Sequence, residues 1–191
     1  MPDPFITTGD LSDILGRDVT NDDGAVIAVD AACDMCRTIS EQEFNRGTTT
    51  ITLDGSGTDS LVLPQMPVAS AGTVVVSGGT VTDWVLNSDL GTLIRKVQDP
   101  AAVADWWSGF SPDIVVWPFG RQNVRVTYVH GYLDADIPRD VRMVALSYAQ
   151  RIVVQGPALL EGLGQASIRY AGAATDLTNG EAAILRKYKR R

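Results

Sequence analysis

Apolar residues recur at helical spacing in two stretches of this sequence. In the first stretch, from Asp23 to Phe44, small and apolar residues lie three or four positions apart on one side, and charged residues follow the other side. The apolar positions are Val26, Val29, Ala32, Cys33, Cys36 and Ile39, and the charged positions are Asp30, Asp34, Arg37 and Glu41. The pattern predicts a long helix with ion pairs between charged residues three or four positions apart.

A second helix is expected to begin at Pro138, because proline at the first helical position loses no hydrogen bond. Its apolar positions are Val141, Val144, Ala145, Tyr148 and Ile152, and Gly156-Pro157 predicts its end. A shorter helix is expected near the N-terminus, with Thr7, Thr8 and Asp10 as cap candidates and Gly16 as its end.

The residues between the two long helices predict β-structure. The most regular run is Asn123–Val129, in which apolar and polar side chains alternate as they do in a half-buried strand. The other expected strands are Thr48–Leu53, Leu61–Leu63, Val68–Ser77, Val81–Leu86 and Leu93–Val97, separated by turns rich in Gly, Ser and Asp. The run Ala101–Phe110 is ambiguous, and its aromatic residues Trp106, Trp107 and Phe110 are expected to pack in a core.

The C-terminal segment differs from the rest of the chain. A stretch of small residues, Ala171–Ala174, predicts a flexible spacer. Thr178 and Glu181 match a capping box, which predicts a short basic helix with Ile184, Leu185 and Tyr188 on its apolar side. A helix of about three turns is marginal alone in water, so this pattern is typical of a docking arm. The alternative is a helix packed on its own domain.

These patterns together predict the α+β class: a small helical bundle with a β-rich insertion between two long helices and a C-terminal arm ending in a short helix. The expected organisation is one domain over residues 1–163, with a helical core over 8–46 and 137–163. The β-rich insertion spans 48–130, and residues 164–191 form the arm. A chain of 191 residues has the length expected for one domain.

The composition is that of an ordinary globular protein, with 45% hydrophobic and 20% charged residues. No apolar run approaches the roughly 18 residues that a membrane span requires, so we expect no membrane association. The net charge of −7 argues against a protein that grips nucleic acid by its phosphates. It is compatible with a wall along which DNA slides, because an acidic surface repels a polyanion.

Residues capable of chemistry are few, and they do not form a catalytic pattern. His130 is the one histidine, it closes a strand-like run, and no G-x-S-x-G motif is present. Cys33 and Cys36 form a C-x-x-C motif about three turns into the first long helix, where the helix dipole no longer lowers a thiol pKa. No second pair of Cys or His supplies the remaining zinc ligands. We therefore predict two buried core cysteines, no enzyme activity, no metal and no cofactor.

Four stretches, in order along the chain, resemble the head-to-tail connector (adaptor) proteins of long-tailed bacteriophages. The first is the long helix that ends in an aromatic residue followed by Arg46, and the second is an L-x-L-P-x-x-P-V run, here residues 61–68. The third is V-R-V-T-Y-x-x-G-Y at 124–132, followed by I-P-x-D-V at 137–141. The last is L-T-x-x-E-x-A-I-L-x-x-Y at 177–188.

The resemblance implies a structural virion protein located at the neck and made in the cytoplasm of a host bacterium. Such adaptors form a ring, usually of twelve copies, under the portal protein. The ring extends the channel through which duplex DNA leaves the head, without sequence-specific binding, and provides the attachment site for the stopper or tail. A C-terminal arm often grips the portal.

By that analogy, the last helix supplies a portal or subunit interface. Its residues are Leu177, Ile184, Leu185, Arg186, Lys187, Tyr188, Lys189 and Arg190. The apolar members are expected to bury against the portal or a neighbouring subunit, and the basic members to pair with acidic groups of the portal.

Two alternatives remain open at the sequence level. One is another neck component, either a stopper or a tail-terminator protein, although these tend to be smaller and dominated by β-structure. The other is a small cytosolic redox protein that uses Cys33 and Cys36.

Overall fold

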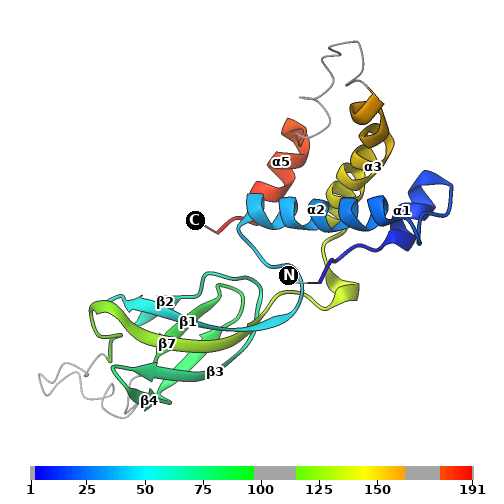
Figure 1. Cartoon of the computed structure of the whole chain (residues 1–191). Coiled ribbons are helices and arrows are strands. Elements are labelled where there is room, and N and C mark those ends of the chain that lie inside the picture. The colour runs from blue at the N-terminus through cyan, green and yellow to red at the C-terminus, as the bar shows by residue number, and fades with distance from the viewer. Residues whose placement is uncertain (1–2, 97–114, 162–176, 191) are drawn as a thin grey trace, which may run out of the picture. The chain divides into compact units, whose positions relative to one another are not determined.

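The computed structural model describes residues 3–96, 115–161 and 177–190. Within them the chain is α+β, with helices at both ends of the sequence and two antiparallel sheets between them (Figure 1). The helices are α1 (Thr8–Leu15), α2 (Asp23–Ser40), α3 (Arg139–Glu161) and α5 (Asn179–Arg186), with a 3-10 turn at Asp134–Asp136. The strands are β1 (Gly47–Gly55), β2 (Ser60–Val62), β3 (Val68–Val76), β4 (Gly79–Val81), β5 (Trp84–Asn87), β6 (Thr92–Arg95) and β7 (Gly120–His130).

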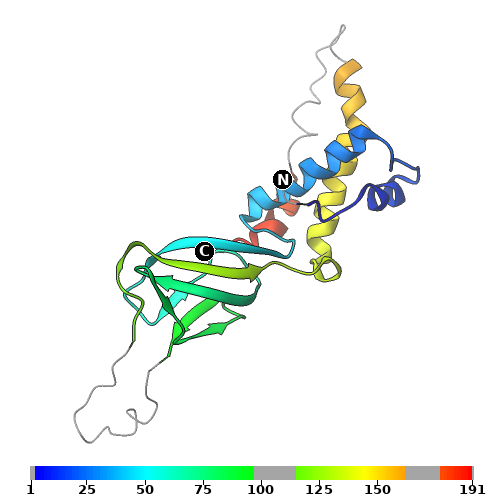
Figure 2. The ribbon, with the colours of Figure 1, turned by 60° about the horizontal axis from the view of Figure 1, so that its bottom comes forward.

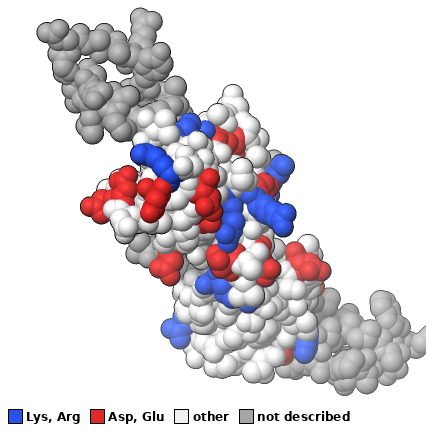
Figure 3. Space-filling model, turned by 90° about the vertical axis from the view of Figure 1, so that its right-hand side faces the viewer, with Lys and Arg blue, Asp and Glu red and all other residues white. Residues whose placement is uncertain are grey.

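The chain divides into two compact units. The helical unit comprises Met1–Asn45 and Tyr132–Arg191, and the β unit comprises Arg46–Gly131. The first unit therefore joins two segments that are far apart in sequence, whereas the second is continuous. Sixteen of the 23 acidic residues belong to the helical unit, and the face of the β unit seen in Figure 3 is mostly uncharged.

The β unit consists of a four-stranded sheet in the order β1-β7-β3-β4 and a three-stranded sheet in the order β2-β6-β5 (Figure 2). β7 lies in the centre of the larger sheet, where Ile51 pairs with Val126 and Val74 pairs with Val126 from the other side. Alternate β7 side chains point into the core and are buried. The core of the unit contains Leu61, Leu63, Val68, Val74, Leu93, Trp117, Val124, Val126 and Tyr128.

The helical unit is held together by α2, which packs against α3, α1 and α5 (Figure 1). The caps predicted for the N-terminal and C-terminal helices are present, and α2 begins with a cap as well. Asp22 accepts a hydrogen bond from the Gly24 backbone, while Thr7 with Asp10 and Thr178 with Glu181 form reciprocal capping boxes. Each cap satisfies backbone N–H groups that have no partner inside the helix.

The first long helix is shorter than predicted. α2 ends at Ser40 because Glu41 takes the left-handed conformation, with φ of 55°, and Phe44 lies beyond the helix as a buried core residue. Arg37, expected on a polar outer face, is buried, and its guanidinium binds the carboxylates of Asp34 at 2.9 Å and Glu43 at 3.1 Å. These two partners compensate the burial of the charge.

Two other boundaries differ from the predictions. The second long helix, α3, continues to Glu161 and so passes Gly156-Pro157; an internal proline removes one backbone hydrogen bond but does not have to end a helix. The run Val81–Leu86 is divided between β4 and β5, which belong to different sheets. Trp106, Trp107, Phe110 and the predicted spacer lie outside the described residues.

Candidate functional site

The C-terminal helix α5 is where most of the predicted interface residues lie. Its first turn is fixed locally, because the Thr178 hydroxyl accepts from the Glu181 backbone N–H at 3.2 Å and the Glu181 carboxylate accepts from the Thr178 backbone N–H at 2.8 Å. This reciprocal pair explains why an eight-residue segment begins a helix at this position.

The same Glu181 carboxylate joins α5 to α3. Arg151 donates from both terminal guanidinium nitrogens to the two Glu181 oxygens, each at 2.8 Å. The hydrogen bond from Arg151 lowers the pKa of Glu181, and the hydrogen bond to Glu181 raises the pKa of Arg151. Two parallel charge-assisted bonds hold both partners in one geometry, so this pair specifies how α5 lies on α3.

The apolar side of α5 belongs to the core of the helical unit. Leu185 is fully buried, and Leu177, Ile184 and Tyr188 pack against the same core while remaining partly exposed. The Tyr188 ring meets the Phe44 ring edge to face, with centroids 5.7 Å apart, and Phe44 meets Phe5 at 5.5 Å. Aromatic pairs of this kind stabilise a core beyond their buried area.

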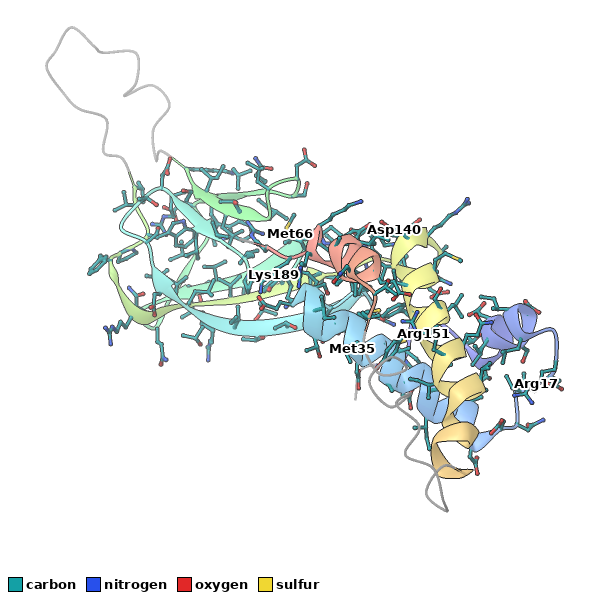
Figure 4. All side chains as sticks on the ribbon, turned by 90° about the horizontal axis from the view of Figure 1, so that it is seen from above. Arg17, Met35, Met66, Asp140, Arg151 and Lys189 are labelled. Atoms are coloured by element: carbon teal, nitrogen blue, oxygen red, sulfur yellow. The ribbon has the colours of Figure 1, made fainter. Side chains whose placement is uncertain are left out.

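Two polar contacts hold the far end of α5. The Tyr188 hydroxyl donates to Asp140 in the first turn of α3 at 2.8 Å, and Lys189 forms an ion pair with Glu41 just beyond α2. Burial, followed by the hydrogen bond to Asp140, raises the pKa of Tyr188. Figure 4 labels Asp140, Arg151 and Lys189, three of the side chains that connect this helix to its neighbours.

The structure therefore separates the predicted interface residues into two groups. Leu177, Ile184, Leu185 and Tyr188 contact the chain's own core, whereas Arg186, Lys187 and Lys189 are exposed and Arg190 is partly exposed. A helix packed on its own domain is the arrangement observed here. The prediction that residues 164–191 act as an arm, and that these side chains contact a portal or a neighbouring subunit, stays a prediction.

Cys33 and Cys36 are free and fully buried, as predicted. Burial raises the pKa of both thiols, that of Cys36 to about 12. The thiolate is the reactive form of cysteine, so neither side chain is poised for nucleophilic or redox chemistry at neutral pH.

The side chain of His130 also belongs to the packed interior rather than to an exposed site. It is the last residue of β7, it is buried, and its Nε2 lies 2.9 Å from the Thr49 hydroxyl on β1. Among the described residues no group of three or more His, Cys, Asp or Glu side chains is placed to hold a metal ion. The described helices also contain no segment long and apolar enough to cross a membrane.

Some of the residues that organise this region carry no clear signal in the sequence. Arg151 lies 30 residues from Glu181, and only the chain fold brings them together. The capping-box motif marks Glu181 but does not show that its carboxylate also binds a second helix. Asp140 could be recognised as a first-turn acid of α3, but its bond to Tyr188 spans 48 residues.

No protein-family model matches the sequence, and no curated protein does. Solved structures of gene transfer agent (GTA) particles, however, contain chains with the same fold. A chain in the neck of an empty GTA particle, computed with C6 symmetry, aligns over 97% of this chain and 90% of its own length, with a TM-score of 0.59 and 14% identity.

Two further solved structures contain chains that align with this one. A chain in the neck of a native GTA particle, computed with C12 symmetry, aligns over 96% of this chain and 88% of its own, with a TM-score of 0.55 and 14% identity. A chain in the virion of the native particle aligns over 87% of this chain and 77% of its own, with a TM-score of 0.51. The likeness spans both the helical unit and the β unit.

Proposed function

We propose that this chain is a structural neck protein of a phage-like particle, and specifically a head-to-tail adaptor. The observation that carries the proposal is the shared fold with a neck chain over 97% of this sequence, at a TM-score of 0.59. The ordered motifs at residues 61–68, 124–141 and 177–188, which resemble those of adaptor proteins, support it independently of the fold.

The proposed adaptor forms a ring at the virion neck, under the portal protein and above a stopper or tail protein. A ring of twelve copies is supported by the C12 symmetry of the native neck that contains a similar chain. Duplex DNA passes through the lumen without sequence-specific binding. The net charge of −7 on each copy favours passage, because an acidic wall does not retain a polyanion.

The C-terminal helix is the proposed portal or subunit interface. Arg186 and Lys187 extend into solvent from a helix that the Arg151–Glu181 pair holds in place. Because the backbone of this helix is already ordered, its exposed basic groups can meet acidic groups of another protein without a further cost of ordering the backbone. The apolar side chains of α5 contribute to this interface indirectly, because they hold the helix against the core of the helical unit.

A stopper or tail terminator is the nearest alternative. The helical unit contributes 105 of 191 positions, and such components tend to consist mainly of β-structure, which favours the adaptor. A redox protein is disfavoured by two buried thiols with raised pKa values. Loss of an activity on replacing both cysteines with alanine, with the fold intact, would revive that alternative.

The direct test is a phage with a stop codon early in this gene. Electron microscopy should show DNA-filled heads beside complete free tails, and the purified chain should restore joining when added to them. Normal infectious particles would contradict the proposal.

A point variant tests the interface more cleanly than a deletion, because removing residues 175–191 would also remove Leu185 from the core. The variant Arg186→Glu/Lys187→Glu should restore joining poorly. The matched control Arg121→Glu/Arg125→Glu changes two exposed arginines of β7 and should restore it as the original chain does. Equal joining by the two variants would show that the basic residues of α5 do not belong to the interface.

A further inference from the structure

The helical unit exposes apolar side chains at the end formed by α1 and the first turns of α2. Ile27 is 66% exposed, Val26 44% and Ile14 39%. Val26 was expected in the core, but it lies on the outer side of α2. These side chains come from α1 and from the first turns of α2, two helices that contact each other, so they supply apolar area for a contact at this end of the unit.

Acidic residues surround this surface. Between residues 10 and 30 the sequence has six Asp and a single basic residue, Arg17. Asp13, Asp22 and Asp23 are exposed, and Asp22 also caps α2. Figure 3 looks onto the α1 side of the helical unit, where acidic side chains gather. We call this surface, made by Ile14, Val26, Ile27, Asp13 and Asp23, the acidic end.

The opposite charge lies at the other end of α2. Residues 177–190 contain four Lys or Arg and one Glu, and that Glu is the partly buried partner of Arg151. This helix contacts α2, and its Lys189–Glu41 and Tyr188–Phe44 contacts reach the residues that directly follow the C-terminus of α2. Figure 1 shows α1 and α5 at opposite ends of α2, which at 18 residues is about 27 Å long. We call Arg186, Lys187 and the basic residues after them the basic end.

We propose that the acidic end of one copy binds the basic end of a second copy of this chain. The proposal rests on the proposed function, because a ring requires a contact surface on two different sides of every copy. Two different surfaces at opposite ends of a unit produce head-to-tail association, which closes into a ring when the rotation allows. The charges also set the direction, since two acidic ends or two basic ends repel each other.

Each surface can be disabled separately in the full-length chain. Asp23→Lys/Ile27→Lys places two positive charges on the acidic end, and Arg186→Ser/Lys187→Ser removes two positive charges from the basic end without adding negative ones. The matched control is Asp89→Lys/Leu90→Lys in the β5–β6 turn, where Leu90 is 63% exposed and an Asp and an aliphatic residue are likewise changed to Lys. Circular dichroism verifies that all three variants fold as the original chain does.

Sedimentation velocity at low ionic strength measures the association. The original chain and the control should form species larger than dimers, and added salt should weaken them. Each end variant alone should associate roughly tenfold more weakly or worse. An equimolar mixture of the two end variants should form one-to-one heterodimers and nothing larger, because only one intact acidic end and one intact basic end remain to meet.

Three results would overturn the proposal: an original chain that stays monomeric at every concentration, end variants that associate as the original chain does, or a mixture that forms large species. The head–tail joining assay distinguishes a wrong subunit contact from a wrong proposed function. A chain that joins heads to tails but does not associate through these ends is a neck protein with another subunit contact. If only the basic-end variant loses joining, the basic end binds a different partner, such as the portal.

Discussion

The two units of this chain are built from the sequence in different ways. The β unit is one continuous segment, Arg46–Gly131, whose core closes around Trp117 and the central strand β7. The helical unit joins residues 1–45 to residues 132–191, and its core includes Leu185 from the last helix. The helical unit therefore depends on contacts between distant parts of the chain, whereas the β unit can complete its core from its own segment.

The two units are therefore sensitive to substitutions in different parts of the sequence. Damage near the C-terminus should loosen the helical unit while the β unit keeps its structure, and damage to the β core should have the opposite effect. Hydrogen exchange measured segment by segment can follow both units in one experiment, because exchange reports the local opening of each region.

The largest effect is expected for Trp117→Ala. The indole is fully buried, its N–H donates to the Leu93 carbonyl at 3.2 Å, and Arg95 lies 5.1 Å above the ring. Truncation should cost about 3–5 kcal/mol of unfolding free energy through the cavity that it leaves. Hydrogen exchange should increase in β1, β3 and β7 and remain unchanged in α2 and α3. Equal loss of protection in both units would show that they unfold together.

Leu185→Ala should produce the complementary pattern. Leu185 is fully buried among core residues of α2 and α3, so its truncation should cost about 2–5 kcal/mol. Protection should fall in α5 and the C-terminal half of α2, with β7 unaffected. The exposed residue Ala183 on the same helix provides the control, because Ala183→Ser should change neither unit measurably. If Leu185→Ala left α5 protected, the helix would not depend on this contact.

Glu181→Gln is expected to lower the free energy of unfolding by about 1–3 kcal/mol, because it replaces a bidentate salt bridge to Arg151 with a weaker hydrogen bond to a neutral amide. The variant should also change the pH dependence of stability. The folded pKa of Glu181 lies below its ordinary value of 4.5, so its stabilisation is present above pH 4.5 and is lost as the pH falls through the folded value. Denaturant unfolding between pH 7 and pH 3 should show the two curves converging as the pH falls. Parallel curves would mean that Glu181 contributes no charge-dependent stability.

A smaller effect is expected for Tyr188→Phe. It removes one hydrogen bond to the Asp140 carboxylate and keeps the aromatic contact with Phe44, so the cost should be about 0.5–1.5 kcal/mol. Thr50→Ala in the β unit removes an exposed hydroxyl pair with Thr127 and should cost less, because water replaces that bond. A larger cost for Thr50→Ala than for Tyr188→Phe, measured by thermal unfolding, would reverse the comparison.

Much of the helical unit could be predicted from the sequence because its signals are local. The capping boxes at Thr7 and Thr178, the helix stop at Gly16 and the burial of Cys33 and Cys36 all depend on neighbouring residues. The strands were located to within a few residues for the same reason, apart from the division between β4 and β5.

The contacts that assemble these elements could not be predicted. The pairing of β1 with β7 joins Ile51 to Val126, and the Arg151–Glu181 and Tyr188–Asp140 contacts each join two helices. A spacing rule reaches only one or two turns along a helix, so it does not contain this information. The resemblance to adaptor proteins supplied the functional hypothesis, and the placement of Leu185 in the chain's own core was visible only in the structure.

We propose above that this chain forms a ring at the neck of a phage-like particle. A cryo-electron microscopy reconstruction of the neck of the particle that encodes it tests that claim most directly. We expect a ring of copies of this fold between head and tail, with the acidic end of each copy against the basic end of the next. A neck whose density contains no copy of this fold would contradict it.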